Sequence, residues 1–393
     1  MEHHARHERI WRFLRPFVRL YFRISANCRV PETCELEGPL FVMCNHNTDL
    51  DPLILGTAFK HQFYYVASEH VMRSGILSKL LAFAQPPIVR QKGGSAAGTV
   101  REMLKTFKEG QSVGLFPEGN RSWDGVTRNF APATGKLAKT SGATLVTVCL
   151  KGAYLASPRW SGARIRRGGI TVEIRGVYSP EELKKMSTAE VNALIARDLF
   201  EDAFELQRSL EKPVRYRSKT PAEHLETALC ICPKCRKTGT MRSRKTEFFC
   251  TECGLKVRYE ETGFFSGEED IPFDTVRDWY AWQVNEIKAL CDDTAEGGLI
   301  FEDAGFRLKS VKTGVSSRDL GIGTLSLYRD ALVLPDNTRI PLDKLAGMAI
   351  RGSSCLFLST DGGENYEITA PVSTSCEKYL SACMALGCSV NGT

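Results

Sequence analysis

The sequence lacks any uninterrupted apolar run of about 18 residues or more, the length that a membrane-spanning helix needs. We therefore expect no conventional transmembrane helix. Its first residues also lack the charge-free apolar segment and the small-residue cleavage site of a secretory signal peptide, because arginines recur through residues 6–23. Without an export signal, the 14 cysteines indicate a reducing compartment, and we expect a cytoplasmic protein.

Internal repeats and low-complexity tracts are absent as well, which argues against a solenoid or a disordered chain. The glycines of "GIGTLS" at 321–326 do not have the three-glycine spacing of a dinucleotide-binding loop. What remains is a composition with 42% hydrophobic and 25% charged residues in a chain of 393, which is typical of a globular protein. A chain of this length predicts two or three domains.

Positive charge is concentrated at the N-terminus. Residues 1–30 hold seven Arg and two Glu, so they contribute 7 − 2 = +5 of the formal net charge of +6. Arg12, Arg15, Arg19 and Arg23 recur every three or four residues and therefore share one helical face, beside an aromatic-rich surface. This pattern is typical of a helix lying in a membrane interface, and we expect peripheral binding to the inner face of a membrane. The alternative is a helix docked on the protein's own core. A nucleic-acid-binding arm is disfavoured.

Strand-like and helical runs alternate from residue 40 to about 178, which predicts an α/β sheet flanked by helices. The predicted strands are 39–44, 62–68, 86–90, 112–118, 144–150 and 169–176. The predicted helices are 52–59, 76–83, 95–110 and 190–210, the last opened by a capping box from Ser187 to Glu190.

Polar side chains gather where these predicted strands end, which is where α/β proteins bind their ligands. They are His46, Asp51, Arg90, Glu118, Gly119 and Arg121. A neutral imidazole at His46 suits a general base, and Asp51 suits the acid that fixes its tautomer. Asp51 before Pro52 also predicts a helix N-cap. Guanidinium groups match phosphate oxygens, and backbone N–H groups near Gly119 are candidates to receive an oxyanion.

Four short blocks carry a resemblance to a known family. "NHNTDLD" at 45–51 resembles the first block of the glycerolipid acyltransferases, and "FPEGNRS" at 116–122 resembles the third. "IVRQ" at 88–91 is similar to the second block, and residues 135–152 are similar to the fourth. The best match is the 1-acyl-glycerol-3-phosphate acyltransferase group, over roughly residues 38–178. Asn120 and Thr147 depart from the family pattern, which usually has Thr and Pro at these places.

This resemblance implies transfer of a fatty acyl group from acyl-CoA or acyl-carrier protein to the free hydroxyl of lysophosphatidate, making phosphatidate. His46 and Asp51 would be the catalytic pair. The lysophospholipid acceptor would be bound by Arg90, Glu118, Gly119 and Arg121. Two alternatives stay open: an acyltransferase acting on another lysophospholipid or on glycerol 3-phosphate, and a non-catalytic, membrane-bound lipid-binding adaptor.

A second motif lies further along the chain. Cys232, Cys235, Cys250 and Cys253 have the paired spacing of a four-Cys zinc ribbon, and residues 237–249 between the pairs suit a β-hairpin. A closed four-thiolate site predicts a structural zinc ion as cofactor. Redox pairs or chance spacing are the alternatives, and Cys230 is interpreted as a bystander. A nucleic-acid-binding ribbon is disfavoured because charge outside the N-terminal segment is nearly balanced, so no nucleic-acid partner is expected.

The last part of the chain predicts a helix over 272–291 capped by Asp274, then strands and a closing helix. These strands are 298–311, 323–335, 338–350, 355–360 and 365–370, and the closing helix is 373–387. Strands followed by one helix resemble pleckstrin-homology-like or GRAM-like domains in pattern only. The predicted organisation is an interface helix at 1–30, an acyltransferase domain at 31–215, a zinc ribbon at 225–260 and a mostly-β domain at 265–393.

Overall fold

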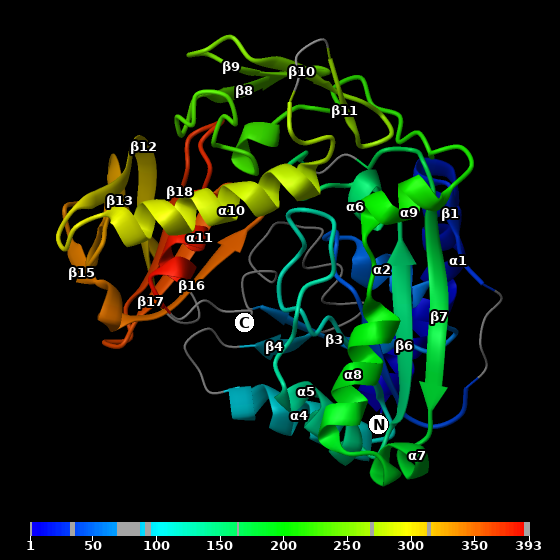
Figure 1. Cartoon of the computed structure of the whole chain (residues 1–393). Helices are drawn as coiled ribbons and strands as arrows, with labels where there is room; N and C mark the ends of the chain where they lie inside the picture. Colours follow the sequence, from blue (N-terminus) through cyan, green and yellow to red (C-terminus); the bar gives the residue numbers. More distant parts are fainter. Residues whose placement is uncertain are drawn as a thin grey trace. The chain divides into compact units, whose positions relative to one another are not determined.

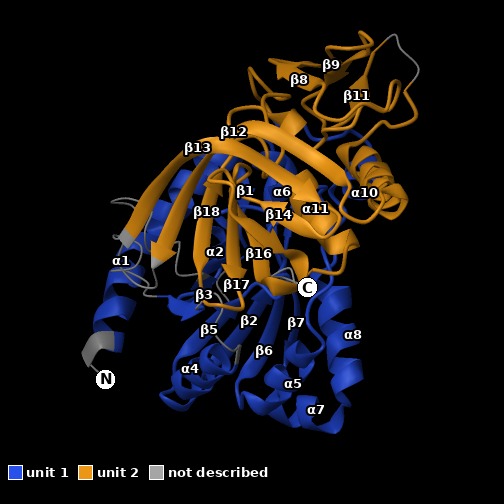
Figure 2. Cartoon of the chain, turned by 90° about the vertical axis from the view of Figure 1, so that its left-hand side faces the viewer, with its two compact units in different colours: residues 1–158, 165–216, 393 blue, residues 159–164, 217–392 orange. Residues whose placement is uncertain are grey.

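The computed structural model describes residues 2–31, 36–68, 87–90, 96–162, 165–267, 271–312 and 316–388. The chain divides into two compact units, shown in blue and orange in Figure 2. Unit 1 contains residues 1–158 and 165–216, and unit 2 contains residues 159–164 and 217–392. The predicted helix at 76–83 lies outside the described residues.

Unit 1 is built on a mixed seven-stranded sheet (Figure 1). In spatial order its strands are β1 (Cys28–Arg29), β7 (Ile170–Tyr178), β6 (Thr144–Lys151), β2 (Leu40–Cys44), β5 (Ser112–Leu115), β3 (Phe63–Ser68) and β4 (Ile88–Arg90). β2 lies between β6 and β5 and is parallel to both, whereas β7 is antiparallel to β6. The predicted α/β sheet and its six predicted strands are confirmed.

Strand β2 is apolar throughout because both of its faces are covered. Phe41 and Met43 belong to a core that also contains Phe107, Ala138 and Leu199. The alternate residues of β2 point to the opposite face of the sheet and are equally buried. A strand buried on both faces has no polar positions, which explains why "LFVMC" contains none and why polar residues start immediately after it.

The helices of unit 1 are α1 (Glu2–Ala26), α2 (Asp51–Gly56), α4 (Ala96–Lys108), α5 (Ala133–Thr140), α6 (Ala153–Ala156), α7 (Pro180–Lys185), α8 (Thr188–Leu199) and α9 (Ala203–Ser209). Ser187 and Glu190 form the predicted capping box of α8. The continuous helix predicted over 190–210 is wrong, however. It stops at Leu199, and α9 begins after Asp202, whose carboxylate accepts hydrogen bonds from two backbone N–H groups of α9.

A second correction concerns Asp51. The N-cap position of α2 is Leu50, which makes no side-chain cap, and Asp51 is the first helical residue. The carboxylate of Asp51 turns back onto the preceding loop instead, where it accepts hydrogen bonds from the backbone N–H groups of Asn47 and Thr48. The predicted N-cap is therefore wrong in position, and the carboxylate is held inside the loop that carries His46.

Helix α1 is docked on unit 1, as one of the two alternatives for its sequence expected, and its binding to a membrane interface stays a prediction. One face docks on unit 1 and buries Trp11 and Phe22, each 1% exposed. Arg15 and Arg19 lie beside that face, and their guanidinium groups donate to the carbonyl oxygens of Thr57 and Val30. The other face leaves five large apolar side chains exposed: Phe13, Phe17, Leu20, Tyr21 and Ile24. None of the described helices combines the length and apolar composition needed to cross a bilayer.

Unit 2 begins with a small antiparallel sheet. Its strands are β8 (Met241–Arg244), β9 (Glu247–Cys250), β10 (Lys256–Tyr259) and β11 (Phe265–Ser266), after a short turn of helix, η2 (Leu225–Thr227). β8 and β9 form the predicted hairpin. The aromatic rings of Phe248 and Phe265 pack on Trp279 of α10 (Val276–Asp293), so the small sheet shares a core with that helix. The cap of α10 is Thr275 and not the predicted Asp274.

The rest of unit 2 is a second seven-stranded sheet, antiparallel throughout, and a closing helix. In spatial order its strands are β15 (Arg339–Pro341), β14 (Ala331–Val333), β13 (Ser316–Tyr328), β12 (Leu299–Lys312), β18 (Asn365–Thr369), β17 (Cys355–Thr360) and β16 (Leu345–Arg351). Helix α11 (Glu377–Ala385) follows β18, and η3 (Leu342–Lys344) precedes β16. The single strand predicted over 323–335 is two strands, β13 and β14.

Residues 159–164 belong to unit 2 although they lie between β6 and β7 in the sequence. The guanidinium group of Arg159 donates to the carbonyl oxygens of Ile350 and Gly352 at 2.7 and 2.8 Å. Trp160 is fully buried, and its ring meets that of Tyr259 edge to face at 5.4 Å. The chain therefore enters unit 2 twice, first through this short segment and then from residue 217 onward.

Candidate functional site

The structure brings His46 and Asp51 together. His46 follows the carboxyl end of β2, and its Nδ1 lies 2.9 Å from Oδ2 of Asp51. The Asp51 side chain is completely buried, whereas that of His46 is 20% exposed. An aspartate that accepts from Nδ1–H selects the tautomer in which Nε2 is the basic nitrogen. The pair therefore has the geometry of a general base and the carboxylate that orients it.

Asp51 is itself held by the loop that it orients. Besides His46, its Oδ2 accepts from the backbone N–H groups of Asn47 at 2.6 Å and Thr48 at 2.8 Å. Its Oδ1 accepts from the hydroxyl of Thr48 at 2.8 Å. Four donors on one buried carboxylate compensate the loss of water and leave it a single position. The imidazole orientation thus depends on backbone groups that cannot rotate away.

Phe116 fixes the imidazole from another side. Its ring stacks on that of His46 with centroids 4.5 Å apart, and the ring of Tyr65 stacks on Phe116 at 6.1 Å. The carbonyl oxygen of His46 also accepts from the backbone N–H of Ser122 at 3.1 Å. The loop after β5 therefore contacts both the side chain and the main chain of His46, which neither block of sequence reveals alone.

Glu118 lies at the site but faces the protein backbone. It is 2% exposed, and its two oxygens accept from the N–H groups of His46 and Arg128, each at 2.7 Å. Burial raises the pKa of Glu118 to about 8, while the same two hydrogen bonds act in the opposite direction. Glu118 therefore joins the loop after β2 to the loop after β5. Its predicted part in acceptor binding stays a prediction.

The other predicted binding residues are placed differently. Arg121 has a side chain only 10% exposed, and its Nη1 lies 3.2 Å from Oδ2 of Asp49 in the His46 loop. Gly119 adopts a φ of +68°, which a side chain would strain, and its N–H donates to the carbonyl oxygen of Phe116. That N–H is therefore used inside its turn, and the prediction that backbone N–H groups near Gly119 receive an oxyanion stays a prediction.

Arg90 is the most remote of the set. It is the exposed last residue of β4, which lies three strand positions from β2 in the sheet. At the usual spacing of neighbouring strands this is about 14 Å between the backbones. The structure thus brings His46, Asp51, Glu118, Gly119 and Arg121 into one cluster and leaves Arg90 at the far edge of the same sheet.

One buried polar group next to this cluster was not predicted from the sequence. The carboxylate of Glu201, between α8 and α9, accepts from the side-chain amides of Asn45 and Asn47 at 3.1 and 3.0 Å. These two residues flank His46. Glu201 is placed here because the chain breaks between α8 and α9. The sequence contains a signal for this break, since Asp202 followed by Glu205 has the spacing of a helix N-terminus.

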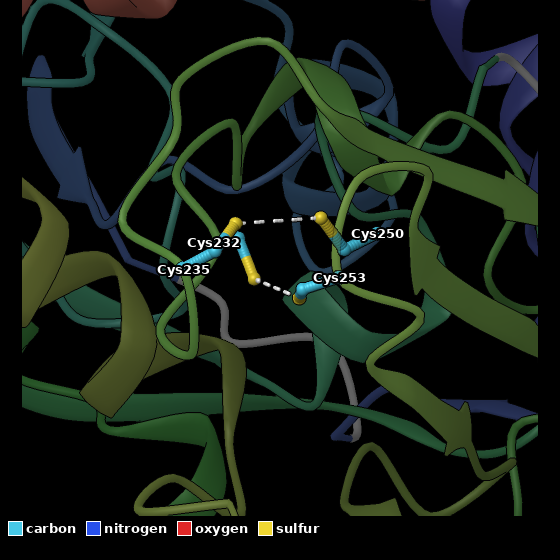
Figure 3. Close-up of side chains that lie close together, drawn as sticks. All are labelled: Cys232, Cys235, Cys250 and Cys253. Atoms are coloured by element: carbon cyan, nitrogen blue, oxygen red, sulfur yellow. Dashed lines mark hydrogen bonds between the residues drawn. The ribbon is translucent and has the colours of Figure 1, made fainter.

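Unit 2 holds the predicted cysteine cluster (Figure 3). The Sγ atoms of Cys232, Cys235, Cys250 and Cys253 all lie within 4.8 Å of one another, and two of the pairs are 3.5 and 3.7 Å apart. A tetrahedron of thiolates around one zinc ion, with bonds of about 2.3 Å, requires sulfur separations of about 3.8 Å. The four thiols therefore fit a single metal ion. Cys230 lies outside the cluster, as the sequence predicted.

Comparison with known proteins identifies the class to which the first cluster belongs. Residues 25–151 match the model of the family described as Acyltransferase, and this range contains His46, Asp51 and the loop after β5. Residues 25–151 are therefore similar to this family over about a third of the chain. Glu201 and the whole of unit 2 lie outside the matched range.

The relatives are more specific. The chain is 31% identical over 120 residues to a 1-acyl-sn-glycerol-3-phosphate acyltransferase of Borreliella burgdorferi, covering 30% of this chain and 48% of the relative. It is 26% identical over 142 residues to the chloroplastic 1-acyl-sn-glycerol-3-phosphate acyltransferase LPAT1 of Arabidopsis thaliana, covering 35% and 39%. The chain therefore spans less than half the length of these two relatives.

Among solved structures, the crystal structure of the 1-acyl-sn-glycerophosphate (LPA) acyltransferase PlsC from Thermotoga maritima is similar to this chain. The TM-score is 0.40 at 20% sequence identity, and the match covers 51% of this chain and 80% of that chain.

Proposed function

We propose that unit 1 transfers a fatty acyl group from an acyl-CoA or acyl-carrier-protein thioester to the free hydroxyl of lysophosphatidate. The observation that carries this proposal is the buried Asp51 bonded at 2.9 Å to Nδ1 of a partly exposed His46, within the segment that is similar to the acyltransferase family. The names of the curated relatives support the acceptor.

In this mechanism Nε2 of His46 removes the proton of the acceptor hydroxyl as its oxygen attacks the thioester carbonyl. The C–O bond forms, the carbonyl electrons move onto oxygen, and their return breaks the C–S bond. The imidazolium then gives its proton to the departing thiolate, so that one ester and one thiol are produced. Asp51 stabilises the imidazolium between the two proton transfers.

The remaining residues of the predicted site have separate parts in the proposal. Arg121, next to the His46 loop, and Arg90, at the edge strand, supply guanidinium groups for the phosphate of the acceptor. Glu118 holds the main chain of His46, and Gly119 permits the turn that follows β5.

The test measures acyl transfer by wild-type protein from each thioester donor to each of three acceptors: lysophosphatidate, glycerol 3-phosphate and lysophosphatidylcholine. We expect transfer to lysophosphatidate to exceed transfer to glycerol 3-phosphate and to lysophosphatidylcholine by at least about tenfold in kcat/KM, a discrimination that one phosphate monoester contact can supply. Labelled acyl-CoA and acyl-carrier-protein thioesters serve as donors, and the product is separated as phosphatidate. Faster transfer to another acceptor would replace lysophosphatidate. Binding of lysophosphatidate vesicles without any transfer would favour the adaptor.

The exposed face of α1 supports peripheral membrane binding on the cytoplasmic side. Phe13, Phe17 and Ile24 are 60–69% exposed and lie in one stripe along the helix, because their spacing of four and seven residues brings them to the same face. Arg12 and Arg23 flank the stripe and are exposed. Apolar side chains inserted between lipid chains, with arginines at the level of anionic headgroups, are the arrangement of an interfacial helix.

The membrane proposal predicts that a Phe13→Ser, Phe17→Ser double variant binds vesicles of phosphatidylglycerol and phosphatidylcholine at least about tenfold more weakly, since each exposed ring contributes on the order of 1 kcal/mol or more when buried in lipid. Vesicle co-sedimentation measures the change. Ile322→Ser is the matched control because Ile322 of β13 is 69% exposed in unit 2. Equal binding by the double variant and the control would contradict the assignment of α1.

For unit 2 we propose that the four-Cys cluster holds a structural zinc ion. A closed set of four thiolates leaves no position for water or substrate, so such an ion supplies folding energy and no chemistry. The seven antiparallel strands followed by α11 support the pleckstrin-homology-like or GRAM-like prediction in element order only. The four-part division at 1–30, 31–215, 225–260 and 265–393 is likewise kept as a proposal.

A further inference from the structure

Glu201 is a buried acid that the mechanism above does not use. It is 5% exposed and lies in the three-residue break between α8 and α9. Its backbone is fixed by Thr127, since the N–H of Glu201 donates to the Thr127 hydroxyl at 2.9 Å and its carbonyl oxygen accepts from the Thr127 N–H at 3.0 Å. The carboxylate therefore projects from a rigid point behind the loop that carries His46.

Both oxygens of Glu201 are occupied by that loop and its neighbour. Oε2 accepts from Nδ2 of Asn45 at 3.1 Å and from Nδ2 of Asn47 at 3.0 Å. Oε1 accepts from the N–H of Gly152, just beyond the end of β6, at 2.6 Å. All three partners donate to Glu201, so the amide groups on both sides of His46 face it with their nitrogens. One side chain thus holds the residues before and after His46.

The connection continues to the catalytic pair. Asn47 is tied through its side chain to Glu201 and through its backbone N–H to Oδ2 of Asp51, the same oxygen that lies 2.9 Å from His46. Asn45 is tied through Oδ1 to the N–H of Leu150 in β6 at 2.7 Å. The His46 loop is therefore held by two carboxylates: Glu201 binds the side chains of Asn45 and Asn47, and Asp51 binds the backbone of the loop.

Holding an acid here is costly, which argues that its contacts matter. Burial raises the pKa of Glu201 to about 8, although the Gly152 N–H, the Asn47 amide and the charge of Lys151 act in the opposite direction. No ion pair with Glu201 occurs among the described residues. An apolar or amide side chain would avoid the desolvation of a carboxylate.

We infer that Glu201 is a positioning residue for acyl transfer: it sets the conformation of Asn45 and Asn47 and so the position of the His46 imidazole against the acceptor hydroxyl. This inference rests on the proposed role of His46 as general base. It extends the functional site to a residue 50 positions beyond the family-matched segment, which ends at residue 151.

The first test is Glu201→Gln. The glutamine keeps the volume but turns one acceptor oxygen into an NH₂ group, so either Gly152 or the two asparagines lose their acceptor. We expect kcat to fall by about 10- to 100-fold with KM for the thioester within about twofold, because a displacement near 1 Å is enough for such a loss. In the Glu201→Gln background, adding Asn47→Ala should change kcat little further, since the two residues act as one unit.

The matched control is Asp198→Asn. Asp198 is equally buried at 5% exposed, on the preceding helix, and does not contact the His46 loop. Its Oδ2 accepts from the hydroxyls of Thr147 and Tyr178, both at 2.7 Å, and its Oδ1 accepts from the guanidinium group of Arg197. We expect this variant to keep wild-type kcat. An equal loss of kcat in both variants would reduce Glu201 to a stabilising residue and overturn the inference, as would wild-type kcat in Glu201→Gln.

A readout that needs no activity separates this inference from the proposed function. Imidazole nitrogen resonances, assigned with a His46→Ala variant, should shift for His46 in Glu201→Gln and stay unchanged in Asp198→Asn. If wild-type protein transfers no acyl group, the proposed function fails while a His46-specific shift still supports positioning. If Glu201→Gln does not fold, Asn47→Ala serves as the second variant, since it removes one of the three groups that donate to Glu201. Wild-type kcat together with unchanged His46 resonances in Asn47→Ala would overturn the inference.

Discussion

We expect Asp51→Asn to lower kcat for acyl transfer by about 10³-fold or more while the protein stays folded. The asparagine can present its carbonyl oxygen where Oδ2 now accepts from His46, Asn47 and Thr48. Its NH₂ group then meets the hydroxyl of Thr48, which can reverse its role and accept. The loop therefore keeps its hydrogen bonds but loses the negative charge that stabilises the imidazolium, a loss of about 10⁴-fold in the best-studied triads.

The measurement is the steady-state kcat and the unfolding midpoint of Asp51→Asn beside Asp198→Asn. Both variants remove one buried carboxylate charge from unit 1, but only Asp51 contacts His46. A small change of midpoint in each variant with loss of kcat confined to Asp51→Asn is the expected result. An Asp51→Asn enzyme within about threefold of wild-type kcat would show that no imidazolium forms in the rate-limiting step.

Zinc removal has the second large expected effect. Structural zinc bound by four thiolates contributes on the order of 10 kcal/mol to the fold that it closes. We expect one zinc ion per chain in wild-type protein and less than about a tenth of that in a Cys232→Ser, Cys250→Ser double variant. Without the ion, amide exchange should accelerate in β8 and β9, which carry or adjoin the second cysteine pair.

The effect should be local within unit 2. Phe248 and Phe265 pack against Trp279, whose indole N–H donates to the carbonyl oxygen of Ile231, the neighbour of Cys232, at 3.0 Å. These contacts of α10 include no thiol of the cluster, so we expect amide exchange within α10 to change less than in β8 and β9. Cys230→Ser is the matched control, because Cys230 is buried nearby but lies outside the cluster. Full zinc content in the double variant would show that the four cysteines are not the ligands.

The parts of the site that sequence predicted are those built from neighbouring residues. His46 lies in the short loop after β2 and Asp51 begins the helix that follows it, and the apolar run of β2 that positions them is recognisable because both faces of that strand are buried. The four cysteines were predictable for the same reason, since two short Cys-x-x-Cys turns need only one hairpin between them to converge.

What sequence could not predict depends on strand order and on a helix break. Arg90 and Glu118 each end a predicted strand. However, β4 is an edge strand whereas β5 is next to β2, and periodicity carries no information on that order. Glu201 looks like a surface residue of a long helix over 190–210. Only the break at 200–202 turns its side chain inward. The sequence also did not show which aromatic residues of α1 are buried. Trp11 and Phe22 pack on unit 1, whereas other aromatic side chains of the same helix are exposed.

The central claim is that His46, oriented by Asp51, is the base for acyl transfer, and the most direct test is the kcat of His46→Ala with lysophosphatidate and the preferred thioester. His61→Ala is the matched control, since His61 lies in the same unit shortly after α2 and is also partly exposed. The account predicts a loss of about 10³-fold or more in His46→Ala and wild-type kcat in His61→Ala. Transfer by His46→Ala at a rate close to that of wild type would contradict it.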